Sequence, residues 1–287
     1  MPYAQVLTTA SVASATGGTF ADTLAANTGD STAVANFATG GARWIEAWGI
    51  DSAHVGELEV IYTRPEATHD QQHGWRSSLQ AAAFNAVGHV GDVNLLAGKD
   101  ILNVFKSDQP QLLVSATASD CVLLSWITEY DDLPGAAAAF ITPELAIAHQ
   151  KSRVGIRVSA VASGTAGAYG AQRAFNADDD RLHANTWYAI IGANVQTSVT
   201  TISLIGPDFG GQRIGLPAGS ISIASSTWFL DQSYKWGKGL IPVFNSNNKA
   251  NTLVQVADSA ASTSPQIDFQ LFELDFPSTY SPVGGGV

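Results

Sequence analysis

The sequence predicts an all-β protein made of two similar domains in tandem. Runs rich in Val, Ile, Thr, Trp and Phe alternate with Gly, Pro, Asn and Asp along the whole chain, a pattern typical of antiparallel sandwiches and barrels. Landmarks also repeat in one order: Trp44 and Gly49 recur as Trp187 and Gly192, each 143 residues later. A period this long indicates a duplicated domain.

Three further landmark pairs keep the same order, with offsets between 139 and 143 residues. They are Pro65 and Pro207, Val104-Phe105 and Val243-Phe244, and Pro134 and Pro277. The repeat divides the chain into a first domain at residues 1–133, a linker at 134–152 and a second domain at 153–287. The alternative that the pattern leaves open is that any β-rich chain yields such matches.

Strands are predicted where β-branched and aromatic runs end at turn residues. In the first half they are 42–49, 56–62, 101–105, 111–116 and 122–129. In the second half they are 154–161, 186–191, 199–204, 219–224, 240–243, 252–257 and 267–274. Polar and apolar residues alternate over 266–274, which predicts one buried face and one polar face.

Two helices interrupt this pattern. Thr142, Pro143 and Glu144 supply a capping hydroxyl, a proline at the first helical position and an acid in the first turn. We expect this helix to continue over 145–151, within the linker. A second helical segment is expected over 77–85, as a crossover within the first half.

The chain carries few charges, and most are negative. Only 14% of its 287 residues are charged, with 25 acidic against 14 basic, for a formal net charge of −11. A negative chain without a Lys/Arg cluster is not expected to bind nucleic acid directly. A surface poor in charge is weakly protected against association, so we expect neighbouring copies to cover much of it. A secreted or structural protein with a Ser/Thr-rich surface is the alternative.

The single cysteine and the two ends of the chain bear on its cellular compartment and on its contacts with neighbours. Cys121 excludes an internal disulfide and lies in an apolar run, which predicts a buried position. Residues 1–5 lack the features of a signal peptide, and no apolar run reaches the roughly 18 residues of a membrane-spanning helix. We therefore expect synthesis in the cytoplasm. The segment up to Gly18 and the tail from Ser281 lack an apolar pattern of their own, so one or both are expected to lie against partners, either neighbouring subunits or the inner face of an assembly.

The residue types that carry chemistry are scattered. His69 and His73 are four residues apart but have no third ligand beside them. Residues Asp178–Asp180 are interpreted first as a solvated loop and second as an oxygen site for a hard cation. The sequence contains no nucleophile elbow and no phosphate-binding loop. It therefore predicts no enzyme, no catalytic residue, no metal site and no cofactor.

Two enzyme classes are built from β-domains, and the sequence has partial features of each. The turn-like segment at residues 215–219 resembles part of a cupin motif, but the His-x-His pair that holds the cupin metal is missing from the sequence. Glu46, Glu57 and Glu59 lie on or beside strands, and a glycosidase would need two of them to face each other. Exposed strand carboxylates are more often solvated.

The seven Trp residues divide into two groups. Those within apolar strand patterns are expected in the core: Trp44, Trp126 and Trp187. Those near turns are candidates for exposed contact, such as stacking on sugars: Trp75, Trp228 and Trp236.

With its tandem β-halves, marked by Trp44/Trp187, Val104-Phe105/Val243-Phe244 and Pro134/Pro277, the chain resembles the double jelly-roll major capsid proteins of tailless icosahedral viruses. The resemblance covers nearly the whole chain and rests on architecture rather than on a short motif. The chain is compact for that family and leaves little room for tall loop insertions.

The resemblance implies two tandem eight-stranded jelly-roll domains joined by a short helical linker. Homotrimers of pseudo-hexagonal outline would tile an icosahedral shell, often over an internal membrane, beside other capsid proteins such as vertex proteins. The chain would then be a structural protein of the virion capsid. Two alternatives come from other classes: a carbohydrate-binding or receptor-binding β-sandwich protein of a virion, and a sandwich-fold glycosidase.

Overall fold

The computed structural model describes a set of segments spread over the whole chain. They are residues 3–11, 22–23, 25–26, 42–50, 56–63, 74–79, 88–90, 109–115, 121–129, 140–163, 169–195, 199–209, 213–217, 226–237, 239–258, 264–277 and 280. Before residue 140 these segments are strands described by their backbone.

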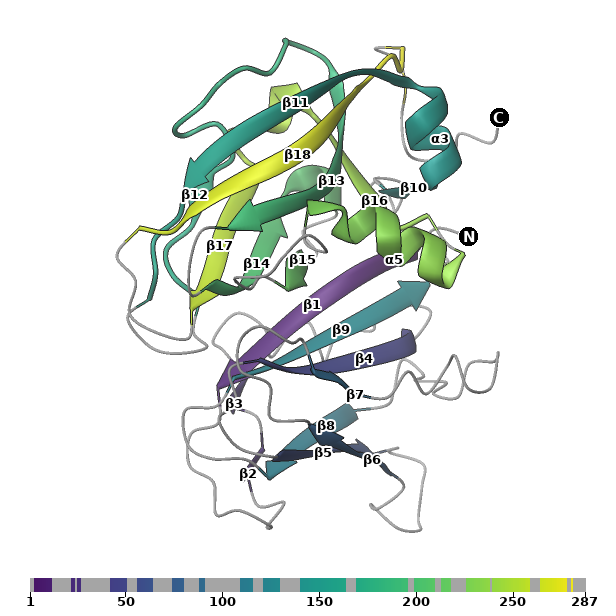
Figure 1. Ribbon diagram of the computed structural model, residues 1–287, viewed down its shortest axis with the longest axis vertical. Helices are drawn as coiled ribbons and strands as arrows, with labels where there is room; N and C mark the ends of the chain where they lie inside the picture. Colours follow the sequence, from purple (N-terminus) through teal and green to yellow (C-terminus); the bar gives the residue numbers. More distant parts are fainter. Residues whose placement is uncertain are drawn as a thin grey trace.

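The described residues form antiparallel sheets with few helices, so the all-β prediction is confirmed (Figure 1). The strands before residue 140 are β1 (Tyr3–Ser11), β2 (Asp22–Thr23), β3 (Ala25–Ala26), β4 (Ala42–Ile50), β5 (Gly56–Thr63), β6 (Gly74–Leu79), β7 (Gly88–Val90), β8 (Gln109–Ser115) and β9 (Cys121–Glu129). Those that follow are β10 (Phe140–Ile141), β11 (Gln150–Ser159), β12 (Arg173–Ala174), β13 (Trp187–Val195), β14 (Val199–Ile205), β15 (Arg213–Pro217), β16 (Ile241–Asn245), β17 (Leu253–Asp258) and β18 (Gln266–Leu274).

Three sheets contain these strands. The largest has nine strands, in the order β12-β17-β14-β15-β1-β9-β4-β7 with β3 paired to β1. A five-stranded sheet runs β10-β16-β13-β18-β11, and a four-stranded sheet runs β2-β8-β5-β6. The halves meet within the largest sheet, because β1 pairs with β15 at Val6 and Ile214.

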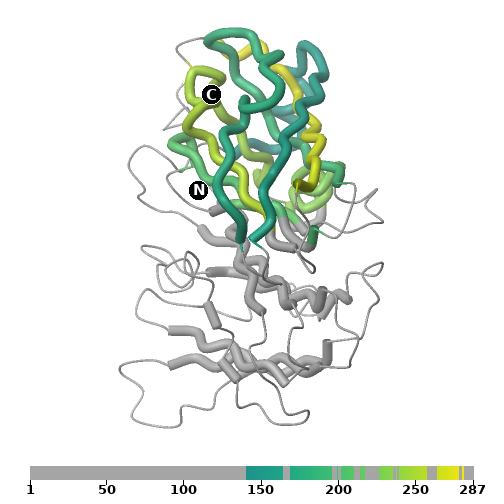
Figure 2. Tube along the Cα trace, turned by 90° about the vertical axis from the view of Figure 1, so that its left-hand side faces the viewer, coloured from purple at the N-terminus to yellow at the C-terminus, as the bar shows by residue number. Residues whose placement is uncertain are grey.

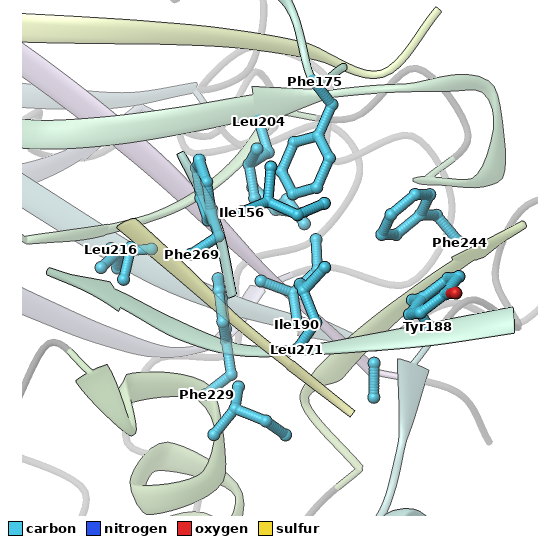
Figure 3. Packing of buried hydrophobic residues seen from close by; sticks show 14 of the residues in the cluster. Ile156, Phe175, Tyr188, Ile190, Leu204, Leu216, Phe229, Phe244, Phe269 and Leu271 are labelled. Atoms are coloured by element: carbon cyan, nitrogen blue, oxygen red, sulfur yellow. The ribbon is translucent and has the colours of Figure 1, made fainter. Parts of the chain in front are cut away.

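In the second half, the β11-β18-β13-β16 strands form one layer of a sandwich and the β12-β17-β14-β15 strands form the other (Figures 1 and 2). Each layer turns its apolar side chains inward, and the core between them is fully buried (Figure 3). Phe175, just after β12, joins the layers: its ring lies 4.7 Å from that of Phe269 in β18 and 5.1 Å from that of Phe244 in β16. Area burial of this kind supplies most of the driving force for folding.

The predicted alternation along the last strand is confirmed. In β18, Ile267, Phe269 and Leu271 are buried, and the residues between them are half-buried. The neighbouring β11 repeats this pattern, with Ile156 and Val158 buried between exposed residues. A strict period of two therefore fixes the register that brings these strands together.

In the described part of the second half, two α-helices accompany the strands. The predicted linker helix is present as α3 (Pro143–Ala148), and the Thr142 hydroxyl accepts a hydrogen bond from the amide of Leu145 at 3.3 Å. The helix is shorter than expected, because Gln150 already begins strand β11, where it pairs with Leu274 of β18. The second helix, α5 (Trp228–Trp236), was not predicted; it packs against β13 and β16 and ends at Gly237 in the left-handed conformation. Two 3-10 turns, η1 (Pro207–Phe209) and η2 (Ser246–Asn248), complete the fold.

Three described segments differ from the sequence analysis or add to it. Residues 77–79 belong to strand β6 rather than to a helix, because they pair with β5. Residues 3–11 form β1 between β9 and β15, a strand that the sequence did not predict; that one or both ends contact neighbouring subunits stays a prediction. Strand β15, which pairs with β14, contains residues 215–217 of the segment that resembles part of a cupin motif.

Several sequence predictions concern residues that the structure does not describe. The strands expected at 101–105 and 219–224, the tail from Ser281 and the pair His69/His73 lie outside the described residues. Among the helices that are described, none is long and apolar enough to span a bilayer.

Candidate functional site

A buried carboxylate stands at one end of the second-half sandwich. Glu273 in β18 has only 3% of its side chain exposed. It accepts hydrogen bonds from the Ser152 hydroxyl at 2.6 Å and the Lys151 ammonium at 2.9 Å, and His183 Nδ1 lies 3.3 Å away. An irregularity in the β11–β18 register between Gln150 and Ser152 brings both β11 residues to the same carboxylate.

The hydrogen bonds keep Glu273 ionised in spite of its burial. Desolvation alone would raise the pKa of this carboxyl. The bonds from Ser152, Lys151 and His183, with the charge of Lys151, outweigh that effect and lower the pKa to about 2. The carboxylate in turn raises the pKa of Lys151 through their hydrogen bond. Glu273 is therefore a permanent anion at neutral pH.

This cluster is suited to holding strands together rather than to proton transfer. A general base works best with a pKa near the working pH, and a carboxyl with a pKa of about 2 is far from that. The Ser152 hydroxyl donates its hydrogen bond to Glu273 and not to a base that could activate it as a nucleophile. Burial raises the pKa of Tyr188, whose hydroxyl accepts the backbone N–H of His183.

The chain beyond β18 folds back over the same end. The His149 imidazole lies 2.7 Å from the Asp275 carboxylate, and its ring is 4.8 Å from that of Phe276. Phe276 stacks on Tyr280 with ring centroids 4.0 Å apart, and Tyr280 meets the edge of Trp187 at 5.5 Å. These contacts fix the C-terminal segment as far as Tyr280 on the second half.

The acidic triplet is neutralised by protein cations. Asp178 accepts from Arg173 at 2.9 Å and from the backbone N–H of Ser159 at 2.6 Å. Arg181 pairs with Asp179 at 3.0 Å, and Lys249 pairs with Asp180 and lowers its pKa. Within the described residues, no group of three His, Cys, Asp or Glu side chains is arranged to hold a metal ion. The triplet therefore ties its loop to the rest of the second half.

The exposure of the Trp side chains differs in part from the prediction. Trp228, expected to be exposed, is only 7% exposed, because it begins α5 and that helix packs on the sheet. Trp187 is buried as predicted. Trp75 lies in β6, opposite Val60 of β5. Trp236 ends α5, and its side chain lies outside the described set.

The other residues weighed for chemistry lie on strands of the first half. Glu46 lies in β4, and Glu57 and Glu59 lie in β5, where they pair with Ser78 and Arg76 of β6. Trp44 lies in β4, Trp126 in β9, and Cys121 begins β9. All of these residues therefore lie in regular strands, as the sequence pattern predicted.

Sequence reasoning missed one charged surface. Three basic residues of β11 are exposed. Arg153 and Arg157 lie opposite Phe272 and Asp268 of β18, and Lys151, in the irregular step at the start of β11, also reaches Glu273. We call this the β11–β18 face: Lys151, Arg153, Arg157, Asp268, Gln270 and Phe272. The signal was in the sequence, because the charges follow a period of two through residues 151–157, but this stretch was divided between a helix end and a strand.

Comparison with known proteins gives weak likenesses. No protein-family model matches the chain, and no curated protein matches it. Among solved structures, the chain is similar to the PBSX exported protein XepA, with 10% sequence identity, a TM-score of 0.24, and coverage of 93% of this chain and 86% of that one. It is also similar to the T=1 Penaeus vannamei nodavirus, with 11% identity, a TM-score of 0.21, and coverage of 94% and 97%. TM-scores this low carry no argument about fold or function.

Proposed function

We propose that the chain is a structural major capsid protein, whose trimers tile an icosahedral viral shell. The observation that carries the proposal is the order of strands in the two halves. When β3 and β10 are left aside, the first half has sheets β1-β9-β4-β7 and β2-β8-β5-β6, and the second has β11-β18-β13-β16 and β12-β17-β14-β15. Counted along each half, the strand orders are the same: 1-8-3-6 and 2-7-4-5. Eight strands arranged in two sheets in this order are typical of a jelly roll.

The repeated landmarks support the same duplication. Trp44 lies in β4 and Trp187 in β13, the third of the eight strands in each half. Pro65 and Pro207 each come two residues after the fourth strand, β5 or β14. Val243-Phe244 lies in β16, whereas its sequence counterpart Val104-Phe105 lies outside the described residues, so this pair stays a prediction.

Two joined copies of one domain suit a threefold assembly. Three such chains present six similar lobes, which can fill a nearly sixfold lattice position while the oligomer keeps its own closed symmetry. The pairing of β1 with β15 favours this use, because it joins the two lobes through backbone hydrogen bonds. The proposed partners are copies of the same chain, lattice neighbours and other capsid proteins, and the proposed location is the virion.

The proposal includes no catalysis and no cofactor. Support comes from the polar cluster around Glu273, whose donors are all committed to one strongly acidic carboxylate. The charges of Asp178–Asp180 are likewise committed to neighbouring cations. Both arrangements add to the rigidity that a shell subunit needs.

The test is the assembly state of the purified full-length protein. Light scattering coupled to size exclusion should give about three times the 30.0 kDa mass of the chain, and negative-stain microscopy should show pseudo-hexagonal trimers or closed particles. A chain that stays monomeric at micromolar concentration and forms no particles would contradict the proposal. Hydrolysis of a glycan that one carboxylate substitution abolishes would redirect it to an enzyme.

A further inference from the structure

The β11–β18 face is an open strip on a sheet that is elsewhere covered. Every residue of β16 and every residue of β13 from Trp187 to Ala193 is buried, and α5 packs against both strands. The outward residues of β11 are exposed and those of β18 are half-buried. Among the described residues, nothing packs over this strip as α5 packs over its neighbours (Figure 1).

The chemistry of the face suits a protein partner. Arg157 and Asp268 form a two-pronged pair across the strands, at 2.6 and 2.8 Å. Arg153 lies over the Phe272 ring, 5.4 Å from its centroid, and has no carboxylate partner among the described residues. Arginine and aromatic side chains are enriched in protein interfaces. The carboxylate of Asp268 within the strip is unfavourable for a phosphate backbone.

The charge of the chain is divided unevenly between its halves. Fifteen of the 25 acidic residues and five of the 14 basic ones precede residue 140, a formal charge of −10. The remaining ten acidic and nine basic residues leave the second half at −1. Three of those nine basic residues lie on the β11–β18 face. The most basic exposed strand of one half thus has its electrostatic complement in the other half of the same chain.

We propose that the β11–β18 face docks against the acidic first half of a second copy of this chain. The inference rests on the proposed assembly and names the surfaces that form it. Arg153 is the central contact, because it lies over Phe272 and no carboxylate in the described part of the chain pairs with it. Since two different surfaces meet, the contact is heterologous, and three such contacts close a ring when the rotation between copies is threefold.

The experiment compares two charge reversals in the full-length protein by sedimentation at low and high salt. Arg153→Glu should weaken association at low salt by about tenfold or more, because it places like charges against each other. Arg181→Glu is the matched control: it makes the same change of charge at an arginine that is 71% exposed and outside the face. It should associate like the wild type, and circular dichroism should show both variants folded.

Each outcome decides the inference. Weaker association of Arg153→Glu alone, with a flatter salt dependence, supports it. Equal association of all three proteins overturns the docking face and leaves the proposed assembly standing, whereas a wild type that never associates removes both. Equal weakening of both variants also overturns it, because the effect is then one of total charge. Binding of a labelled DNA duplex by the wild type and not by Arg153→Glu, with association unchanged, would assign the face to a polyanion instead.

Discussion

At the residue scale, Glu273 is held by groups that are far away in the sequence. Ser152 and Lys151 precede it by 121 and 122 residues, and His183 precedes it by 90. A local pattern cannot reveal such a cluster. What the sequence did predict is the alternation that places β18 in the sheet, and the register with β11 then brings these donors to the carboxylate.

Replacement of this carboxylate should destabilise the second half. In Glu273→Gln the side chain keeps its size but loses the charge that Lys151 and Ser152 donate to, so we expect a loss of about 1–3 kcal/mol in the free energy of unfolding. Urea denaturation followed by fluorescence measures it. Lys151→Met is the control, because the partner at 62% exposure should contribute less than about 1 kcal/mol. Equal losses in the two variants would contradict the assigned burial of Glu273.

The same group predicts a pH dependence. Its pKa in the folded protein, about 2, lies below its ordinary value of 4.5. Glu273 therefore contributes stability that is fully present above pH 4.5 and is lost as the pH falls toward 2, up to about 3 kcal/mol. Unfolding free energies measured across this range should fall steeply in the wild type and less steeply in Glu273→Gln. Parallel curves would show that other carboxyls dominate the acid response.

At the element scale, local signals predicted some elements well and others not at all. The cap at Thr142 and the alternation over 266–274 are local, and both α3 and β18 were predicted. Strand β1 was missed although Tyr3, Val6 and Thr8 are residue types that favour strands. Its pairing with β9 over nine positions is a long-range effect that no local pattern shows. Helix α5 was missed because contact with β13 and β16 stabilises it more than its own propensity does.

The cap of α3 can be tested directly. Thr142→Ala removes the hydroxyl that accepts from the Leu145 amide, so the free energy of unfolding should fall by about 1 kcal/mol. Thr142→Ser keeps the acceptor and should stay within a few tenths of the wild type. Thermal or urea unfolding of the three proteins decides the matter. If the alanine variant is as stable as the serine variant, the cap contributes nothing.

Two glycines should respond very differently to the same substitution. A Cβ on Gly237 would meet nothing within 4 Å, but its φ of 62° costs an L-residue, so Gly237→Ala should lose about 1 kcal/mol. A Cβ on Gly170 would lie 1.6 Å from the carbonyl oxygen of Val161, which is backbone and cannot swing away. Gly170→Ala should therefore lose at least about 3 kcal/mol. Comparable unfolding midpoints for the two variants would argue against the close approach of Gly170 to Val161.

At the scale of the whole molecule, one strand links the two halves. β1 lies between β9 of the first half and β15 of the second, so the largest sheet is shared. Among the described residues, those of the second half form a core between two layers of their own strands. Damage at β1 should therefore separate the halves without unfolding the second.

Val6→Pro is the substitution that makes this separation visible. Val6 pairs with Trp126 of β9 on one side and with Ile214 of β15 on the other, so a proline there removes a donor from a central strand. The cost, on the order of 3 kcal/mol, falls on the first half and on its junction with the second. Limited proteolysis should then digest the first half and leave a protected fragment that begins near residue 140, and calorimetry should resolve two transitions. Val6→Ile keeps the donor and should behave as the wild type. A single transition in the proline variant, with both halves equally protected, would mean that β1 does not hold the halves together, and the assembly would need another link between its lobes.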